Sequence, residues 1–201
     1  MIAREEIRQK GLAIVEWAEE VPLAELAEEL GLVVRDRRVL APRTGGGHPS
    51  LSAMHGLGDF PWHTDGAQEV RTPHWLLLRS LGEAKTPTLL LDGAALAARS
   101  GLDAKLAAAS WLVQGALPFY SPVISPGEGA LRWNPDLMRP RGGRGLATDA
   151  SWRALLAGAQ PQRHPWRAGE VLILDNRRWL HARPAVAPED LERRLERIQC
   201  E

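Results

Sequence analysis

The sequence predicts a mainly β protein, a β-barrel or jelly roll decorated with helices, in a single domain of residues 1–201. Many short apolar runs, rich in β-branched residues and bounded by turn residues, have the length of strands. Segments with helical spacing are few and gather near the start and middle of the chain. No internal repeat or linker divides the 201 residues, a length that suits one domain.

Five segments have the features of helices. Pro22 stands where a helix can begin, and Leu23 and Leu26 then fall on one face. Asp92 can cap a later helix through its carboxylate. The predicted helices are residues 4–10, 22–30, 93–100, 103–110 and 149–158.

The remaining apolar runs favour strands because they are short, partly β-branched and separated by turn residues. The last of them is the longest, and it ends on a histidine. The predicted strands are residues 12–17, 38–42, 75–79, 86–91, 111–117, 130–133 and 169–181.

Glycine-rich or polar stretches predict the loops. Residues 45–47 are three glycines, but the lysine and hydroxyl residue of a phosphate-binding loop do not follow. Residues 66–73 are polar and could cover a site. Residues 139–145 are basic and glycine-rich and predict a solvated loop that could bind an anion. For residues 191–200 the pattern leaves a strand and a charged surface helix open.

Composition argues against several classes of protein. The formal net charge is zero and no basic block is present, which disfavours a nucleic-acid partner. Cys200 is the single cysteine, so neither a disulfide framework nor a cysteine zinc site can form within the chain. The charged start lacks a signal core, and no run has the length of a membrane span. We expect a cytoplasmic protein.

Two separated motifs supply a set of metal-capable side chains. In residues 60–65, His63 and Asp65 stand two apart, so they share one face of an extended segment. More than a hundred residues later, His181 ends an apolar run. Two histidines and one carboxylate form a facial triad, which leaves an Fe(II) ion three open positions. We hypothesise that these three residues are metal ligands.

The same residues carry a family resemblance. The order His63-Thr64-Asp65, then Thr88, then residues 175–183 and an arginine pair resembles the taurine dioxygenase and clavaminate synthase-like family. The resemblance covers nearly the whole chain. It implies an Fe(II)- and 2-oxoglutarate-dependent oxygenase on a double-stranded β-helix, which is a cupin-like jelly roll. Both 2-oxoglutarate and O2 would be co-substrates.

Carried over by position, the resemblance makes His63, Asp65 and His181 the iron ligands and the catalytic centre. Because Asp65 is present, no ligand position is vacated for a halide. Halogenation is therefore disfavoured, and hydroxylation or desaturation is favoured.

The resemblance also implies residues for the distal carboxylate of 2-oxoglutarate. Thr88 would donate its hydroxyl, although a β-branched residue also simply suits a strand. Arg193 is the preferred anchor and Arg194 the alternative, because Arg193 with Arg197 reproduces an R-x-x-x-R pair of the family. Arg197 would face the same cavity and contact co-substrate or substrate. A planar, permanently charged guanidinium suits a carboxylate.

Two residues are weaker candidates for substrate binding. Arg132 could project into the barrel mouth and meet an anionic substrate, and a surface salt bridge is the competing interpretation. Trp62 flanks the proposed ligands, and core packing is its competing role. The other histidines have no partner at ligand spacing; they are His48, His55, His74 and His164.

The resemblance thus implies hydroxylation of an unactivated C–H bond in a small molecule, an amino-acid or natural-product intermediate, with release of succinate and CO2. Desaturation, cyclisation or epimerisation at the same iron is one alternative. A catalytically inactive, metal-binding cupin-like scaffold or sensor is another. Family members are commonly longer than this chain, which leaves open a carrier- or partner-presented substrate and a homo-oligomer that completes the site.

Overall fold

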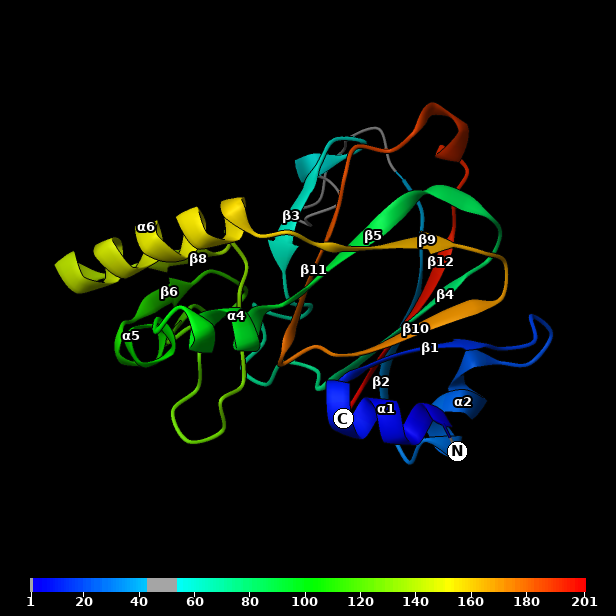
Figure 1. Cartoon of the computed structure of the whole chain (residues 1–201), viewed down its shortest axis with the longest axis horizontal. Helices are drawn as coiled ribbons and strands as arrows, with labels where there is room; N and C mark the ends of the chain where they lie inside the picture. Colours follow the sequence, from blue (N-terminus) through cyan, green and yellow to red (C-terminus); the bar gives the residue numbers. More distant parts are fainter. Residues whose placement is uncertain (1, 43–53) are drawn as a thin grey trace.

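Two facing β-sheets form the body of the molecule, and a third small sheet with three helices stands beside them (Figure 1). The computed structural model describes residues 2–42 and 54–201. The predicted glycine loop at residues 45–47 lies outside the described residues. The mainly β class predicted from the sequence is confirmed.

The helices are α1 (Ile2–Lys10), α2 (Leu23–Glu29), α4 (Gly93–Arg99), α5 (Asp103–Ala108), α6 (Gly142–Gly158) and the 3-10 turn η1 (Pro188–Asp190). The first sheet has the order β1 (Leu12–Glu16), β10 (Glu170–Asp175), β4 (Trp75–Ser80), β12 (Leu195–Cys200) and β2 (Val34–Leu40). The second has the order β3 (Phe60–His63), β11 (Trp179–Arg183), β5 (Ala84–Asp92) and β9 (Gln162–Trp166). The third has the order β7 (Phe119–Ser121), β6 (Trp111–Val113) and β8 (Met138–Pro140).

The space between the two large sheets is filled by apolar side chains from both. Alternate residues of each strand point inward, as the period of two requires. Burying this apolar surface is what holds the sheets face to face. The buried members of this core are Leu76, Leu78, Ala84, Leu90, Trp166, Leu172, Leu174, Trp179 and Leu195.

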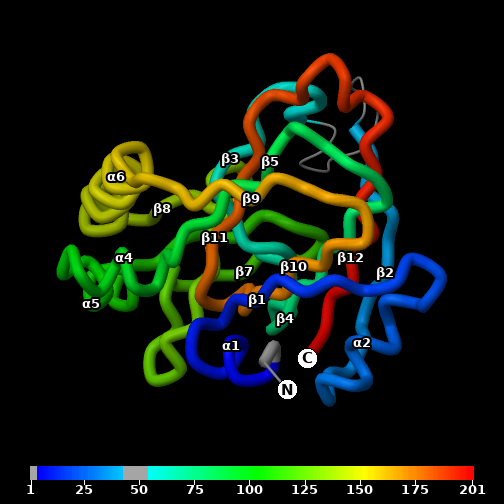
Figure 2. Tube along the Cα trace, turned by 45° about the vertical axis from the view of Figure 1, so that its right-hand side comes forward, coloured from blue at the N-terminus to red at the C-terminus, as the bar shows by residue number. Residues whose placement is uncertain are grey.

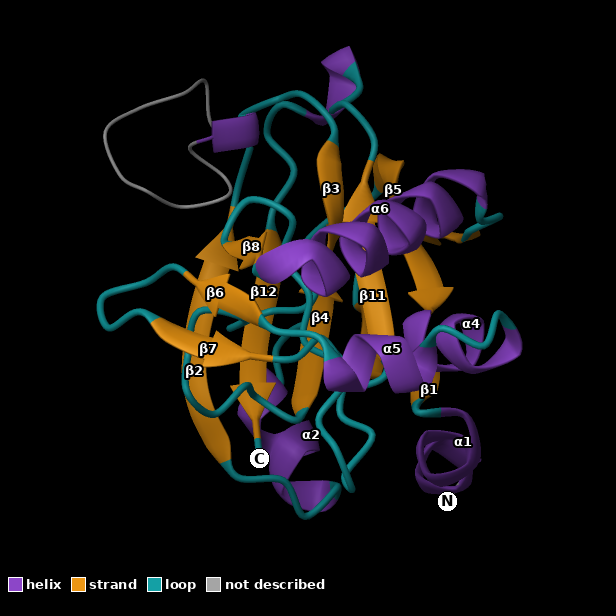
Figure 3. Cartoon of the chain, turned by 90° about the vertical axis from the view of Figure 1, so that its left-hand side faces the viewer, coloured by secondary structure: helices purple, strands orange, loops and turns teal. Residues whose placement is uncertain are grey.

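Each large sheet also buries its outer face. Helix α2 packs Leu23 and Leu26 against the first sheet, where Ile173 and Ile198 face outward. Helices α4, α5 and α6 and the third sheet cover the second sheet, and Figures 2 and 3 show them gathered on that side. Because both outer faces are covered, the polar residues of the inner face are held on a rigid support.

The prediction of one continuous strand over residues 169–181 is wrong in part. The run 169–181 forms two strands in different sheets, with a turn between Asp175 and Trp179. Oδ1 of Asp175 accepts a hydrogen bond from the backbone N–H of Arg177 at 2.9 Å. Asp and Asn favour such side-chain turns, so the pair Asp175-Asn176 marked the break.

The predicted basic loop at residues 139–145 is also wrong in part, because β8 takes its start and α6 begins at Gly142. Gly145 allows the helix to approach the backbone just before β6: an added Cβ would lie 3.3 Å from the carbonyl oxygen of Ser110. The predicted strand at residues 130–133 contributes only a single bridge, between Leu131 and Ile124. Of the two alternatives for residues 191–200, the strand is confirmed over β12.

Among residues 2–42 and 54–201, no helix combines the length and apolar character needed to cross a membrane.

A buried ion pair joins β4 to β12, and its loss should be costly. Arg79 donates to Oε2 of Glu196 through Nε at 3.0 Å and Nη2 at 2.6 Å, and both side chains are almost fully buried. Glu196→Leu leaves a buried charge unpaired and should lower the free energy of unfolding by about 3–5 kcal/mol. Urea denaturation measures this loss. The double variant Arg79→Met/Glu196→Leu should lose less unfolding free energy than Glu196→Leu. Equal losses in the two variants would contradict the role of the unpaired buried charge.

Candidate metal centre

Three side chains from distant parts of the sequence converge at one point inside the barrel. His63, Asp65 and His181 are buried, and one ligand atom from each lies within 4.8 Å of the others. Nε2 of His63 is 3.6 Å from Oδ1 of Asp65, and Nε2 of His181 is 3.5 Å from the same oxygen. The sequence motifs are thus brought together as hypothesised.

Strand pairing brings the two histidines together. His63 ends β3 and is the register partner of His181 on β11, so both rings leave the same face of the sheet. Their ring centroids are 4.1 Å apart. Nδ1 of His63 is 2.9 Å from the carbonyl oxygen of Pro61. A proton on that nitrogen would donate to the carbonyl and leave the lone pair of Nε2 directed at the site.

His181 is held in its neutral form. Burial, reinforced by neighbouring His63, lowers the pKa of His181 to about 4, although Asp65 opposes the shift. A neutral imidazole is the form that binds a metal. Its Nδ1 is buried and has no hydrogen-bond partner among the described residues.

Asp65 is held in its ionised form. Burial alone would raise its pKa, but the Arg197 guanidinium and the two histidines outweigh burial and hold the pKa well below its ordinary value. Nη1 of Arg197 donates to Oδ2 at 2.9 Å, and Nε2 of Gln199 donates to the same oxygen at 3.1 Å. Two imidazoles and one carboxylate, aimed at a common point, fit a divalent iron ion.

The backbone of Asp65 is clamped by a buried amide. Oδ1 of Asn176 accepts from the Asp65 N–H at 2.8 Å, and Nδ2 of Asn176 donates to the Asp65 carbonyl at 3.0 Å. The same Nδ2 donates to the carbonyl of Pro73 at 2.9 Å. This side chain is fully buried in the turn between β10 and β11. It fixes the backbone from which the carboxylate projects, although β3 has ended at His63.

Thr88 faces the barrel interior from β5. Its Oγ1 accepts a hydrogen bond from Nε1 of Trp166 at 3.1 Å, so its own proton is free to donate elsewhere. Thr88 is the register partner of His164 on β9. A polar strip therefore runs across these two strands within an otherwise apolar core.

Arg193 and Arg194 differ in their surroundings. Arg193 is half-buried, and its Nε is buried without a hydrogen-bond partner among the described residues, whereas Arg194 is exposed. Burial and the nearby Arg183 lower the pKa of Arg193 to about 10, and Asp190 offsets this only in part. Arg193 also lies near enough to lower the pKa of His164. A buried guanidinium in this state favours an anion beside it.

The two weaker candidates lie elsewhere. Trp62 points away from His63, as strand alternation requires, and packs on the outer core beneath α4–α6. Arg132 donates to the backbone carbonyls of Ala67, Glu69 and Val70. It therefore secures the loop that follows Asp65.

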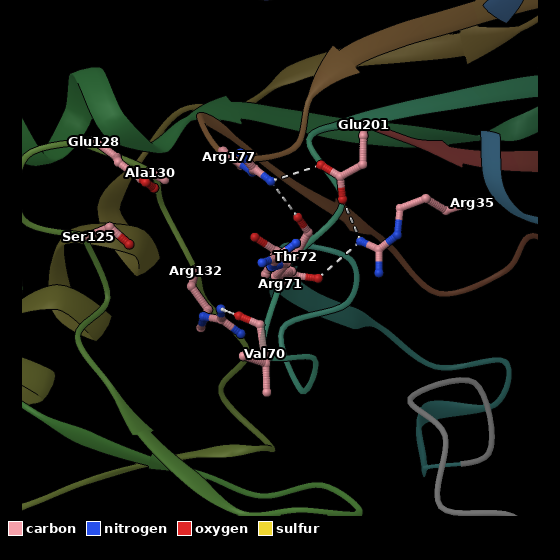
Figure 4. A pocket seen from close by; sticks show the side chains of 10 residues that line it. All are labelled: Arg35, Val70, Arg71, Thr72, Ser125, Glu128, Ala130, Arg132, Arg177 and Glu201. Carbon is pink, nitrogen blue, oxygen red and sulfur yellow. Dashed lines mark hydrogen bonds and ion pairs between the residues drawn. The ribbon is translucent and has the colours of Figure 1, made fainter. Parts of the chain in front are cut away.

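A basic cavity of about 750 Å³ lies against that loop (Figure 4). Arg177 and Arg35 reach in from its other sides, bond to the carbonyls of Thr72 and Arg71, and share Glu201. None of the three converging ligands lines this cavity. Arg35, Arg132 and Arg177 thus hold the loop at residues 66–72, which keeps the chain beyond Asp65 in place.

Sequence reasoning missed Asn176 and Gln199. Asn176 carried a signal, because it is a polar residue next to an aspartate in the middle of an apolar run. Gln199 carried a weaker signal: it continues the alternation of Leu195 and Arg197 along one face of β12.

Comparison with solved structures finds the same architecture in iron oxygenases. Asparagine oxygenase, solved with Fe(II), 3-hydroxyasparagine and succinate, superposes with a TM-score of 0.74 at 16% identity over 98% of this chain and 77% of that chain. The non-heme iron oxygenase OrfP, solved with Fe and alpha-ketoglutaric acid, gives 0.71 at 15% identity over 98% and 78%. The PvcB protein of Pseudomonas aeruginosa gives 0.71 at 20% identity over 98% and 77%.

The chain has the jelly-roll fold of these oxygenases. The sequence matches no family model, and no curated protein is similar to it. At 15–20% identity the likeness establishes the fold and leaves the chemistry to be argued from the side chains.

The lowered pKa of His164 should make the stability of the protein depend on pH. Burial lowers this pKa, nearby Glu170 opposes the shift, and Arg193 adds to it. In the unfolded chain the pKa of a histidine is about 6.5. Below that pH the unfolded chain binds a proton that the folded chain does not, so stability falls as pH falls. Urea denaturation should show a smaller loss between pH 7.5 and pH 5 for His164→Gln than for the wild type. Identical losses would contradict this.

Proposed function

We propose that this chain is an Fe(II)- and 2-oxoglutarate-dependent oxygenase, acting as a single domain. The observation that carries the proposal is the buried convergence of His63, Asp65 and His181 in a fold whose solved examples hold Fe and 2-oxoglutarate or succinate. These three residues would be the iron ligands. Iron bound there would couple the decarboxylation of 2-oxoglutarate to the oxidation of a C–H bond.

The protein's own contribution begins with the ligand set. The neutral His181 and the ionised Asp65 are ready to bind a cation at neutral pH without releasing a proton from either group. The apolar core between the sheets keeps water away from the site and strengthens charge interactions there.

The distal carboxylate of 2-oxoglutarate would bind at Arg193 and Thr88. The buried Nε of Arg193 has no hydrogen-bond partner in the part of the chain that the structure describes, and Thr88 has a hydroxyl proton to donate. Arg194 is exposed, which favours Arg193 as the anchor. A carboxylate there would neutralise a guanidinium that burial and Arg183 otherwise disfavour.

We propose hydroxylation of a small molecule, with one oxygen atom of O2 entering the product and the other entering succinate. Asparagine oxygenase and OrfP are solved with hydroxylated amino acids, 3-hydroxyasparagine and dihydroxy-arginine, which supports an amino-acid-like substrate. Succinate formation from a panel of free amino acids tests this. Desaturation, cyclisation or epimerisation would also release succinate, and mass spectrometry of the product separates these outcomes from hydroxylation.

Binding of iron and 2-oxoglutarate can be tested without a substrate. Anaerobic Fe(II) plus 2-oxoglutarate should give the wild type a weak visible charge-transfer band. His63→Ala should abolish the band because it removes one of three ligands. His74→Ala is the matched control, since that ring is partly exposed and lies near Asp175. If the wild type shows no band, the proposed oxygenase function is contradicted, and an inactive metal-binding scaffold is favoured.

The two arginines give a second prediction. Arg193→Gln should weaken 2-oxoglutarate binding by about 10-fold or more, the scale of a lost charge-assisted contact of about 1.5–3 kcal/mol. Arg194→Gln should change it little. Titration of the charge-transfer band at fixed Fe(II) gives both affinities, and the opposite order would assign the anchor to Arg194.

A further inference from the structure

The two oxygens of Asp65 have different surroundings. Oδ1 faces Nε2 of His63 and Nε2 of His181 at 3.6 and 3.5 Å. Oδ2 accepts from Arg197 at 2.9 Å and from Gln199 at 3.1 Å. One carboxylate oxygen has about two lone-pair positions, so these two donors use what Oδ2 can offer. Only Oδ1 is left for a metal.

The number of oxygens that Asp65 gives to a metal decides what else can bind. Two histidines and a one-oxygen carboxylate leave three of six positions open. A carboxylate that chelates through both oxygens leaves two. In the proposed reaction the keto-acid end of 2-oxoglutarate takes two positions and O2 takes one, so a chelating Asp65 would block it.

We infer that Arg197 and Gln199 are positioning residues that keep Asp65 a one-oxygen metal ligand. The inference rests on the proposed function and deepens it. It also gives Arg197 a different role from the co-substrate contact that the family resemblance implies. Partners that bond a metal ligand in this way fix its orientation.

The fold holds both donors firmly. Arg197 and Gln199 stand two apart on β12, so they share its inner face, and β12 is paired on both sides by β2 and β4. Nη2 of Arg197 donates to Oδ2 of Asp36 on β2 at 3.2 Å, which steadies the guanidinium from behind. Gln199 is buried.

The backbone of Asp65 is restrained as well. The Asn176 amide bonds to the N–H and the carbonyl of Asp65, so the point from which the side chain projects is held. Three side chains outside the ligand set therefore act on Asp65: Asn176 holds its backbone, and Arg197 and Gln199 bond its Oδ2.

The experiment uses Co(II)-loaded protein and oxalate, a small dianion that chelates a metal through two oxygens and is too short to reach a distal anchor. The variants are Gln199→Met, Arg197→Gln and the conservative Arg197→Lys. Arg38→Gln is the matched control, because Arg38 is the exposed register partner of Arg197 on β2. Far-UV circular dichroism establishes that each variant is folded.

We expect Gln199→Met and Arg197→Gln to alter the Co(II) absorption spectrum before oxalate is added. Both should also weaken oxalate and 2-oxoglutarate binding by about 10–100-fold, the range seen when partners of metal ligands are removed. Arg197→Lys should fall between these variants and the wild type, and Arg38→Gln should match the wild type.

A different pattern would overturn the inference. If Arg197 serves the co-substrate, Arg197→Gln weakens 2-oxoglutarate alone, while oxalate binding and the Co(II) spectrum stay unchanged in both variants. If the wild type binds neither Co(II) nor 2-oxoglutarate, the proposed function itself fails, and that result is distinct from a failure confined to the variants.

Discussion

The buried carboxylate of Asp65 is the interaction on which the rest of the site depends. An ionised group inside a protein is costly unless it is paired and hydrogen-bonded. Here the pairing comes from Arg197, which also donates a hydrogen bond, a second hydrogen bond comes from Gln199, and the backbone support comes from Asn176. Satisfying one charge therefore brings together the end of β3, the middle of β12 and the turn before β11.

Burial shifts the pKa values at this site in opposite directions: it lowers the pKa of His181 and, by itself, would raise the pKa of Asp65. It holds His181 neutral, whereas Asp65 stays ionised because Arg197 and the two histidines together outweigh the cost of burial. For Arg193, which precedes β12, Asp190 offsets burial only in part, and its buried Nε has no hydrogen-bond partner among the described residues. In the proposed function these differences would let the cation bind at the triad and the distal carboxylate of 2-oxoglutarate bind at Arg193.

Much of this arrangement could be predicted from the sequence. The three ligand candidates could be named from the spacing of His63, Asp65 and His181, and they meet as hypothesised. Strand pairing brings the two histidines together, whereas Asp65 lies beyond the end of β3 and is held by Asn176. The turn at Asn176 was missed because an apolar run on both sides of it reads as one strand.

Contacts across the barrel could not be predicted. The bonds from Gln199 and Arg197 to Oδ2 of Asp65 join residues more than 130 positions apart, and their existence depends on the register of β12 against β4. The alternation of residues predicts on which face of a strand a side chain lies, but the residue that it contacts across the barrel depends on tertiary packing.

The most direct measurement is an anomalous difference map from a crystal of the protein grown anaerobically with Fe(II). The account predicts one strong peak within bonding distance of Nε2 of His63, Nε2 of His181 and Oδ1 of Asp65, with Oδ2 still bonded to Arg197 and Gln199. A peak at other residues, or no peak at these three, would contradict it.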